Sequence, residues 1–85
     1  MQVDGAIIKE QGQTFSIIVV QSHVINNTAE AAQLRREWAS VFPLPIILMT
    51  QDSRGVPTYQ GRKDIVRFLA NIDFRRIPWK TYTIS

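Results

Sequence analysis

Pro43-Leu-Pro-Ile-Ile-Leu-Met49 opens the stretch of sequence that decides how this chain folds. Residues 46–49 are apolar at every position, which is typical of a strand at the centre of a sheet with both faces covered. A turn over residues 51–55 follows, and residues 56–60 return as a second strand. Pro57 cannot donate a ladder hydrogen bond, so this returning strand is predicted to lie at a sheet edge. Gly61 then precedes a helix with apolar residues at helical spacing, which are Ile65, Phe68, Leu69 and Ile72.

The first twenty residues predict a β-hairpin. Residues 6–10 and 13–20 form its two strands, and Gly12 lies between them because glycine readily takes the positive φ of a tight turn. The second strand is apolar on both faces towards its end, as expected of a central strand.

A polar loop over residues 21–27 is expected to lead into the first helix. Asn27 and Glu30 have the spacing of a capping box, although Thr28 is an alternative cap. The helix ends before two prolines, Pro43 and Pro45, which disfavour helical geometry. Its apolar side recurs at spacings of three and four and consists of Ala31, Leu34, Trp38, Val41 and Phe42.

These elements predict a single domain, residues 1–85, of the α/β (α+β) class with element order ββαββα. We expect a four-stranded mixed sheet in order 1-2-3-4 with one helix on each face, because two helices on one face would leave the other face of the central strands in water. Strands two and three are expected to be parallel, joined by a right-handed helical crossover. Nine side chains are predicted to be largely buried, namely Phe15, Ile17, Val19, Leu34, Trp38, Ile47, Met49, Phe68 and Leu69.

The segment beyond Ile72 is too rich in aromatic residues for a loose tail. Phe74, Ile77 and Trp79 are expected to fold back onto the sheet, because exposing all three would create a large apolar patch. The sequence thus predicts an ordered C-terminal segment. Residues 81–84 are an alternative candidate for a short fifth strand.

Pro45 before the apolar strand, the hairpin to residues 56–60, and Gly61 before the helix around residues 65–69 resemble the C-terminal half of the thioredoxin-like fold. The resemblance covers about a third of the chain. It implies that strands two and three run antiparallel rather than parallel. The paired-cysteine motif of that family has no counterpart here, so its redox activity is not carried over.

Composition places the chain among globular proteins, with 45% hydrophobic and 20% charged residues. Cysteine is absent, which excludes disulfides, thiolate metal sites and thiol redox chemistry. The start of the sequence lacks a basic segment followed by a long apolar stretch, and no apolar run approaches the length of a membrane span. We therefore expect a cytoplasmic protein.

Charge is distributed unevenly around the net value of +3, because residues 1–53 carry −2 and residues 54–85 carry +5. Lys63 and Arg67 place like charges one helical turn apart, and Arg62 and Lys63 lie at the positive end of the helix dipole. Such a conflict can mark an anion site, although compensation by Asp64 on a solvated face is the favoured interpretation. The candidate anion-binding or nucleic-acid-binding residues are Arg54, Arg62, Lys63, Arg67, Arg75, Arg76 and Lys80.

The aromatic residues Phe74, Trp79 and Tyr82 alternate with these cations. This pattern is typical of a surface that stacks on single-stranded nucleic acid. Core or dimer contacts are the favoured alternative, and Trp79 and Tyr82 are the candidate interaction residues.

His23 is the only histidine of the chain. In the parallel topology the loop carrying Ser22, His23 and Asn26 shares one end of the sheet with the turn carrying Asp52 and Arg54, and ligands favour such ends. Capping and turn roles are the commoner explanation. One histidine and scattered carboxylates do not make a metal cluster, and no cofactor is indicated.

The sequence therefore favours a small non-enzymatic module that binds a protein partner or itself. One alternative is a nucleic-acid-binding module that uses the basic C-terminal third. Another is a ligand-binding or enzymatic domain with a site around His23 and Asp52.

Overall fold

The computed structural model describes residues 2–10 and 12–84 as a small α+β domain with a mixed sheet. Its strands are β1 (Gln2–Glu10), β2 (Gln13–Val19), β3 (Ile46–Gln51), β4 (Pro57–Gln60) and β5 (Lys80–Thr83). Its helices are α1 (Ser22–Ile25), α2 (Thr28–Trp38), α3 (Lys63–Ala70) and the 3-10 helix η1 (Phe74–Arg76). None of the helices in the described residues is long and apolar enough to cross a membrane.

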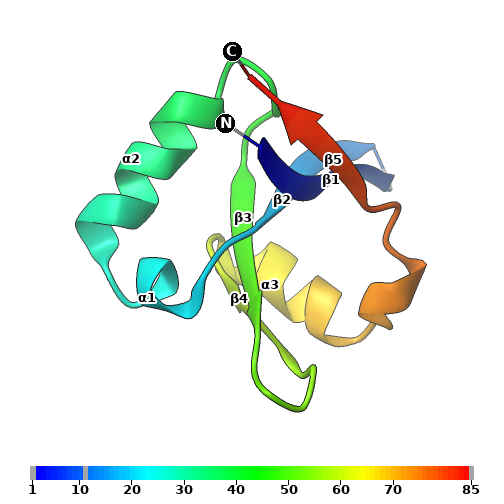
Figure 1. Cartoon of the computed structure of the whole chain (residues 1–85). Helices are drawn as coiled ribbons and strands as arrows, with labels where there is room; N and C mark the ends of the chain where they lie inside the picture. Colours follow the sequence, from blue (N-terminus) through cyan, green and yellow to red (C-terminus); the bar gives the residue numbers. More distant parts are fainter. Residues whose placement is uncertain (1, 11, 85) are drawn as a thin grey trace.

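The strands form one sheet in the order β4-β3-β2-β1-β5 (Figure 1). β2 and β3 are parallel, whereas the other neighbouring pairs are antiparallel. The predicted order of the first four strands, the parallel central pair and the edge position of β4 are confirmed. The predicted four-stranded sheet is one strand short: the candidate fifth strand over residues 81–84 forms as β5, which pairs with residues 2–5 of β1 and extends the sheet beyond it.

The polar loop predicted over residues 21–27 was also wrong in part, because α1 occupies its centre. Val24 is only 8% exposed and packs into the cluster around Ile18 and Leu48, so one apolar side chain docks this short helix onto the sheet. The N-cap role of Asn27 is confirmed at the next helix, but the reciprocal half of the capping box is absent, because the backbone N–H of Asn27 donates to the carbonyl of Val24 at 3.2 Å. The side chain of Asn27 accepts a hydrogen bond from the backbone N–H of Glu30 at 3.1 Å.

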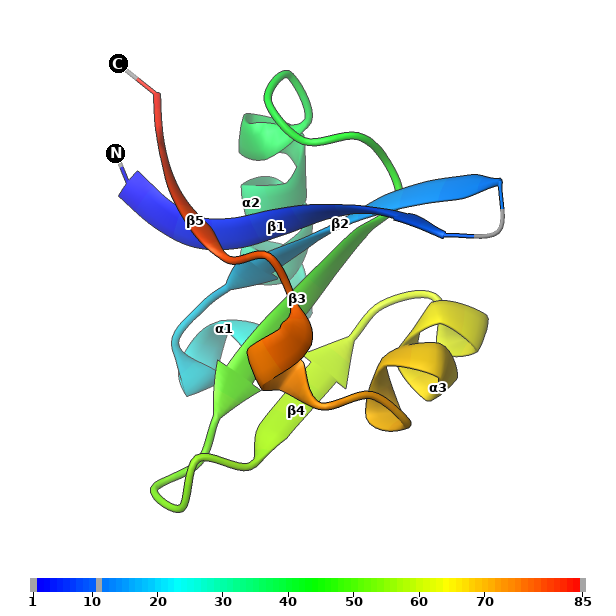
Figure 2. The ribbon, with the colours of Figure 1, turned by 90° about the vertical axis from the view of Figure 1, so that its right-hand side faces the viewer.

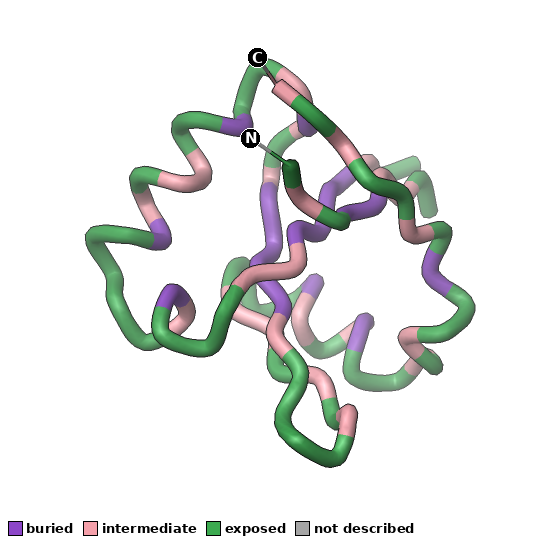
Figure 3. The backbone as a smooth tube through the Cα atoms, in the orientation of Figure 1, coloured by how far each residue is buried: buried purple, intermediate pink, exposed green. Residues whose placement is uncertain are grey.

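Helices cover both faces of the sheet, with α1 and α2 on one face and α3 on the other (Figures 1 and 2). Buried residues concentrate on β2, β3 and the inward sides of the helices (Figure 3). Of the nine side chains predicted to be buried, Val19, Leu34 and Phe68 are half-buried at the margins of the two clusters, and the others are buried. Phe74, Ile77 and Trp79 pack against the α3-side cluster, so the predicted return of the C-terminal segment is confirmed.

Ser16 ties the segment before β3 to β2. Its side chain is fully buried, and its hydroxyl donates to the carbonyl of Pro43 at 2.7 Å. Its backbone N–H donates to the carbonyl of Pro45 at 3.0 Å, and the Leu44–Pro45 peptide bond is cis. The start of β3 is thereby held in register beside β2.

Arg35 connects α2 to the two strands at the far side of the sheet, and the sequence analysis did not find this role. Its guanidinium donates to the carbonyl of Ile46 at 3.0 Å, and to the carbonyl and side-chain oxygen of Gln60 at 2.8 and 2.6 Å. The side chain is partly buried, and the loss of hydration lowers the pKa of its guanidinium. Arg35 of α2 therefore supplies hydrogen-bond donors to backbone carbonyls of both β3 and β4.

We predict that Arg35→Met lowers the free energy of unfolding by about 1–3 kcal/mol, because it keeps the aliphatic stem but leaves partly buried carbonyls without a donor. Arg36→Met is the matched control. That neighbouring side chain is exposed and has no ion pair among the described residues, so its replacement should change stability by less than about 0.5 kcal/mol. Denaturant unfolding measures both values, and equal losses would contradict the role of Arg35.

Candidate interaction surface

The seven basic candidates are all exposed but do not form one surface. Arg54 lies in the turn between β3 and β4, and Lys80 begins β5 on the opposite side of the sheet. The other five lie at the start and middle of α3 or in η1, and they are Arg62, Lys63, Arg67, Arg75 and Arg76.

Three of these arginines are paired with aspartates. Arg54 lies 3.3 Å from Asp52, and the Arg62–Asp64 and Arg75–Asp73 pairs each have a separation of 2.7 Å. Within residues 2–10 and 12–84, the remaining candidates have no ion pair, and they are Lys63, Arg67, Arg76 and Lys80. The paired arginines offer little net charge to an anion, so the basic candidates divide into two groups.

Asp64 supports the solvated interpretation of the α3 N-terminus. Arg62 is the N-cap residue, and its guanidinium donates to both carboxylate oxygens of Asp64 at 2.7 Å. The hydrogen bonds from Arg62 lower the pKa of Asp64, and the same contact raises the pKa of Arg62. The cation nearest the start of the helix is thereby compensated, as one sequence interpretation proposed.

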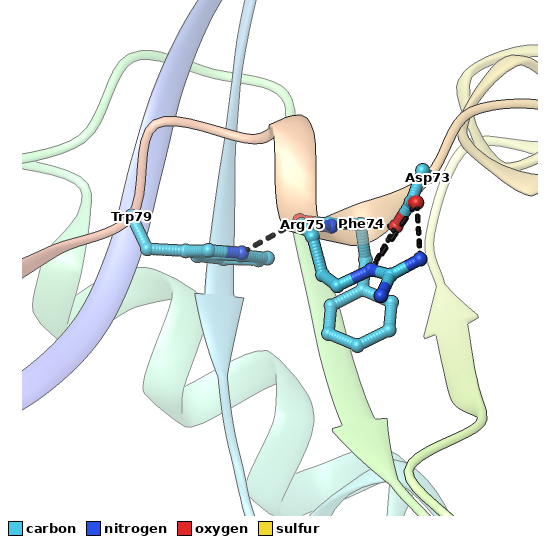
Figure 4. A network of polar contacts seen from close by, with 4 residues as sticks. All are labelled: Asp73, Phe74, Arg75 and Trp79. Carbon is cyan, nitrogen blue, oxygen red and sulfur yellow. Dashed lines mark hydrogen bonds and ion pairs between the residues drawn. The ribbon is translucent and has the colours of Figure 1, made fainter.

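Asp73 organises the turn that contains η1 (Figure 4). Its carboxylate accepts hydrogen bonds from the backbone N–H of Arg75 at 3.0 Å and from the guanidinium at 2.7 Å. The Arg75 side chain is the main reason that the pKa of Asp73 falls from 3.8 to about 2. In the same turn the indole N–H of Trp79 donates to the carbonyl of Phe74 at 2.9 Å.

The two candidate interaction residues lie on opposite faces of the sheet. Trp79 packs against the α3-side cluster with Phe74, whereas Tyr82 packs against the α2-side cluster. The ring of Tyr82 has its centre 4.6 Å from that of Phe42. Both side chains are half-buried, so these aromatic residues contribute to the two cores and do not form one stacking platform.

His23 and Asp52 lie after parallel strands, as the topology requires, but each contacts a different partner. The Nε2 atom of His23 is 3.4 Å from the Glu30 carboxylate. Asp52 accepts from the backbone N–H groups of Arg54 at 2.8 Å and Val56 at 2.9 Å, which is the pattern of a turn. These contacts favour structural roles for both residues.

A groove of about 300 Å³ lies between β1 and the segment formed by α3 and η1. Partly buried apolar side chains line it from β1 and α3, and Lys9, Glu10 and Arg76 bring charge to its margin. We call this surface the β1 groove, and it is lined by residues 7–10, Phe68, Ile72 and residues 76–78.

The outer edge of β1 opens beside this groove. β5 pairs with β1 only from Gln2 to Gly5 and then leaves towards η1 (Figure 2). Residues 6–10 pair with β2 on their inner side, and no described residue supplies a backbone partner on their outer side. The sequence analysis missed this surface. The apolar Ile7 and Ile8 in a strand without proline were the available signal.

Comparisons with known proteins found no family model that matches the chain, and no significantly similar curated protein or solved structure.

We predict that the stability supplied by the Asp73–Arg75 pair is fully present above about pH 4 and is lost as the pH falls through about 2, because folding lowers the pKa of Asp73. The melting temperature of Asp73→Asn should lie below that of the unchanged protein near neutral pH, and the gap should close in acid. Arg75→Gln should show the same closing gap, whereas Arg36→Gln should not. Thermal unfolding across this pH range measures the gap, and a constant gap would contradict the assignment.

Proposed function

We propose that the chain is a small non-enzymatic module that binds a protein partner through the β1 groove. The observation that carries this proposal is the open outer edge of residues 6–10 beside a partly apolar groove. A strand edge presents unpaired N–H and C=O groups, and proteins use such edges to bind extended segments of other chains.

The other two edges of the sheet are better protected. β4 has four residues and begins with Pro57, which cannot donate a ladder hydrogen bond. β5 also has four residues, and it carries Lys80 and two exposed threonines. Short strands, lysine and proline are the usual means of keeping an edge from pairing. Along the open edge of residues 6–10 the one such protection is Lys9, and Ala6, Ile7 and Ile8 carry none.

A nucleic-acid-binding module is the second proposal. Four exposed cations without an ion pair among the described residues support it, namely Lys63, Arg67, Arg76 and Lys80. Two observations weaken it. Three arginines are already paired with aspartates, and Trp79 and Tyr82 pack into separate cores.

The remaining expectations stay predictions. A site around His23 and Asp52 is supported only by their common end of the sheet, and a cytoplasmic location rests on the sequence alone. The thioredoxin-like resemblance is supported by the order of β3, β4 and α3, but the parallel pairing of β2 and β3 differs from the arrangement that it implies.

We predict that peptides selected from a displayed random library bind at the β1 groove. A nitrogen-15 titration should shift the amide resonances of residues 6–10 together with those of Phe68 and Ile72. Val56, which is 50% exposed on the opposite side of the sheet, supplies the control resonance. A selected peptide that shifts resonances only outside the groove, or a selection that yields no binder, would contradict the proposal.

For the nucleic-acid alternative, we predict that Lys63→Gln combined with Arg67→Gln weakens binding to a short oligothymidylate and flattens its salt dependence. The melting temperature should not fall, because the change removes a like-charge pair. The control removes the same number of charges from aspartate-paired positions, Arg54→Gln with Arg75→Gln, and should weaken binding less. Fluorescence anisotropy at several salt concentrations makes the comparison, and an absence of binding at low salt would reject this alternative.

A further inference from the structure

We infer that the β1 groove accepts an acidic, extended peptide segment, which adds to the sheet as a further strand beside residues 6–10 of β1. The inference rests on the proposed function and deepens it, because it commits to the conformation and the charge of the partner.

The backbone supplies the first argument. Residues 6–10 are a regular strand, paired in register with β2 from Ala6–Ile17 to Glu10–Gln13, so their outward backbone groups are already aligned as a ladder. Within the described part of the chain these groups have no backbone partner. Five residues at about 3.3 Å each give an edge of about 17 Å, which suits a segment of about five extended residues.

The side chains beside the edge supply the second argument. In an added strand, successive side chains point to opposite faces, so every second residue would face α3 and η1. That face of the groove is apolar, with Ile8, Phe68 and Ile72 half-buried and Ile77 buried. An alternating segment with apolar residues at every second position therefore fits this edge better than a uniformly polar one.

Charge at the edge determines which residues suit the alternate positions of the added strand that point away from α3. It also favours a different partner over a second copy of the chain. Lys9 and Arg76 line the groove without an ion pair among the residues described. Lys9 lies on the α2-side face of β1 with Ile7, where the other positions of an added strand point, whereas Arg76 in η1 and the Glu10 carboxylate lie on the α3 side. Lys80 lies where β5 leaves β1. A second copy of the chain would bring two cations, Lys9 and Arg76, but only one carboxylate, Glu10, to an edge that already has an excess of positive charge. Aspartate or glutamate residues of a different partner would complement that excess.

The test uses the whole chain and a capped synthetic peptide of about seven residues in which valine alternates with aspartate. Binding should shift the amide resonances of residues 6–10 and slow their hydrogen exchange. Two further peptides carry N-methyl groups on either the odd or the even positions. In an added strand only one of these sets points its N–H groups at β1, so one peptide should lose affinity by about tenfold or more while the other keeps it. Equal behaviour of the two methylated peptides would overturn strand addition.

The charge is tested separately. A peptide with lysine in place of aspartate should bind at least about tenfold more weakly. Lys9→Glu combined with Arg76→Glu should weaken the aspartate peptide and strengthen the lysine peptide, whereas the control variant Arg36→Glu should change neither. Equal binding of the two peptides to the unchanged protein would overturn the acidic preference without requiring any variant to fold.

The two levels of the proposal fail differently. If library peptides bind in the groove but are uncharged, basic or helical, the interaction module stands and the acidic-strand inference is wrong. If no peptide of any kind binds there, both are wrong. If the protein forms a dimer in solution at low peptide concentration, and dimerisation shifts only the amide resonances of residues 6–10, the occupant is a second copy of the chain. That result would also overturn the inference.

Discussion

The parallel pairing of β2 with β3 is the constraint on which the rest of the structure depends. Each side chain from Ile46 to Met49 is at most 3% exposed, so both faces of the central sheet must be covered. One face receives α1 and α2, and the other receives α3 with η1. The far half of the β1–β2 hairpin is left with a partial covering, and the β1 groove lies there.

The sequence predicted those elements whose burial or boundary is marked by a pattern of neighbouring residues. The apolar run of β3, the proline of β4 and the spacing of Asn27 and Glu30 each determine one element without help from distant residues. β5 was not predictable in the same way, because its strand character depends on a partner at the other end of the chain. The hydroxyl of Thr81 reaches the Asp4 carboxylate across 77 positions of sequence. The short α1 depends on a single buried side chain, which produces no periodic signal.

The candidate site was predicted less completely, for reasons visible in particular residues. Counting cations overestimated the basic surface, because Arg54, Arg62 and Arg75 each have an aspartate two positions away that neutralises them. Trp79 precedes β5 and its indole N–H donates to the carbonyl of Phe74, so it packs on the α3 side, whereas Tyr82 lies within β5 and packs on the α2 side. The groove was beyond prediction because its extent depends on where the pairing of β5 with β1 ends, at Gly5 and Lys80, and this register between the two ends of the chain has no local signal.

The contacts of Arg35 give the two sides of the sheet unequal rigidity. Opening β4 would break the hydrogen bonds that join Arg35 of α2 to Gln60, so fluctuations of β4 are coupled to the helical layer. Among the described residues, no side-chain hydrogen bond joins β1 to a helix, and its one side-chain bond is from Thr81 of β5 to Asp4. A sheet with two receptive edges can pass strands from molecule to molecule and grow into a filament, since head-to-tail contacts need not close. Here the β4 edge is held by Arg35 and, among the described strands, only residues 6–10 of β1 are open to a further strand. Each association therefore ends after one added strand, and the protein can bind a strand without polymerising.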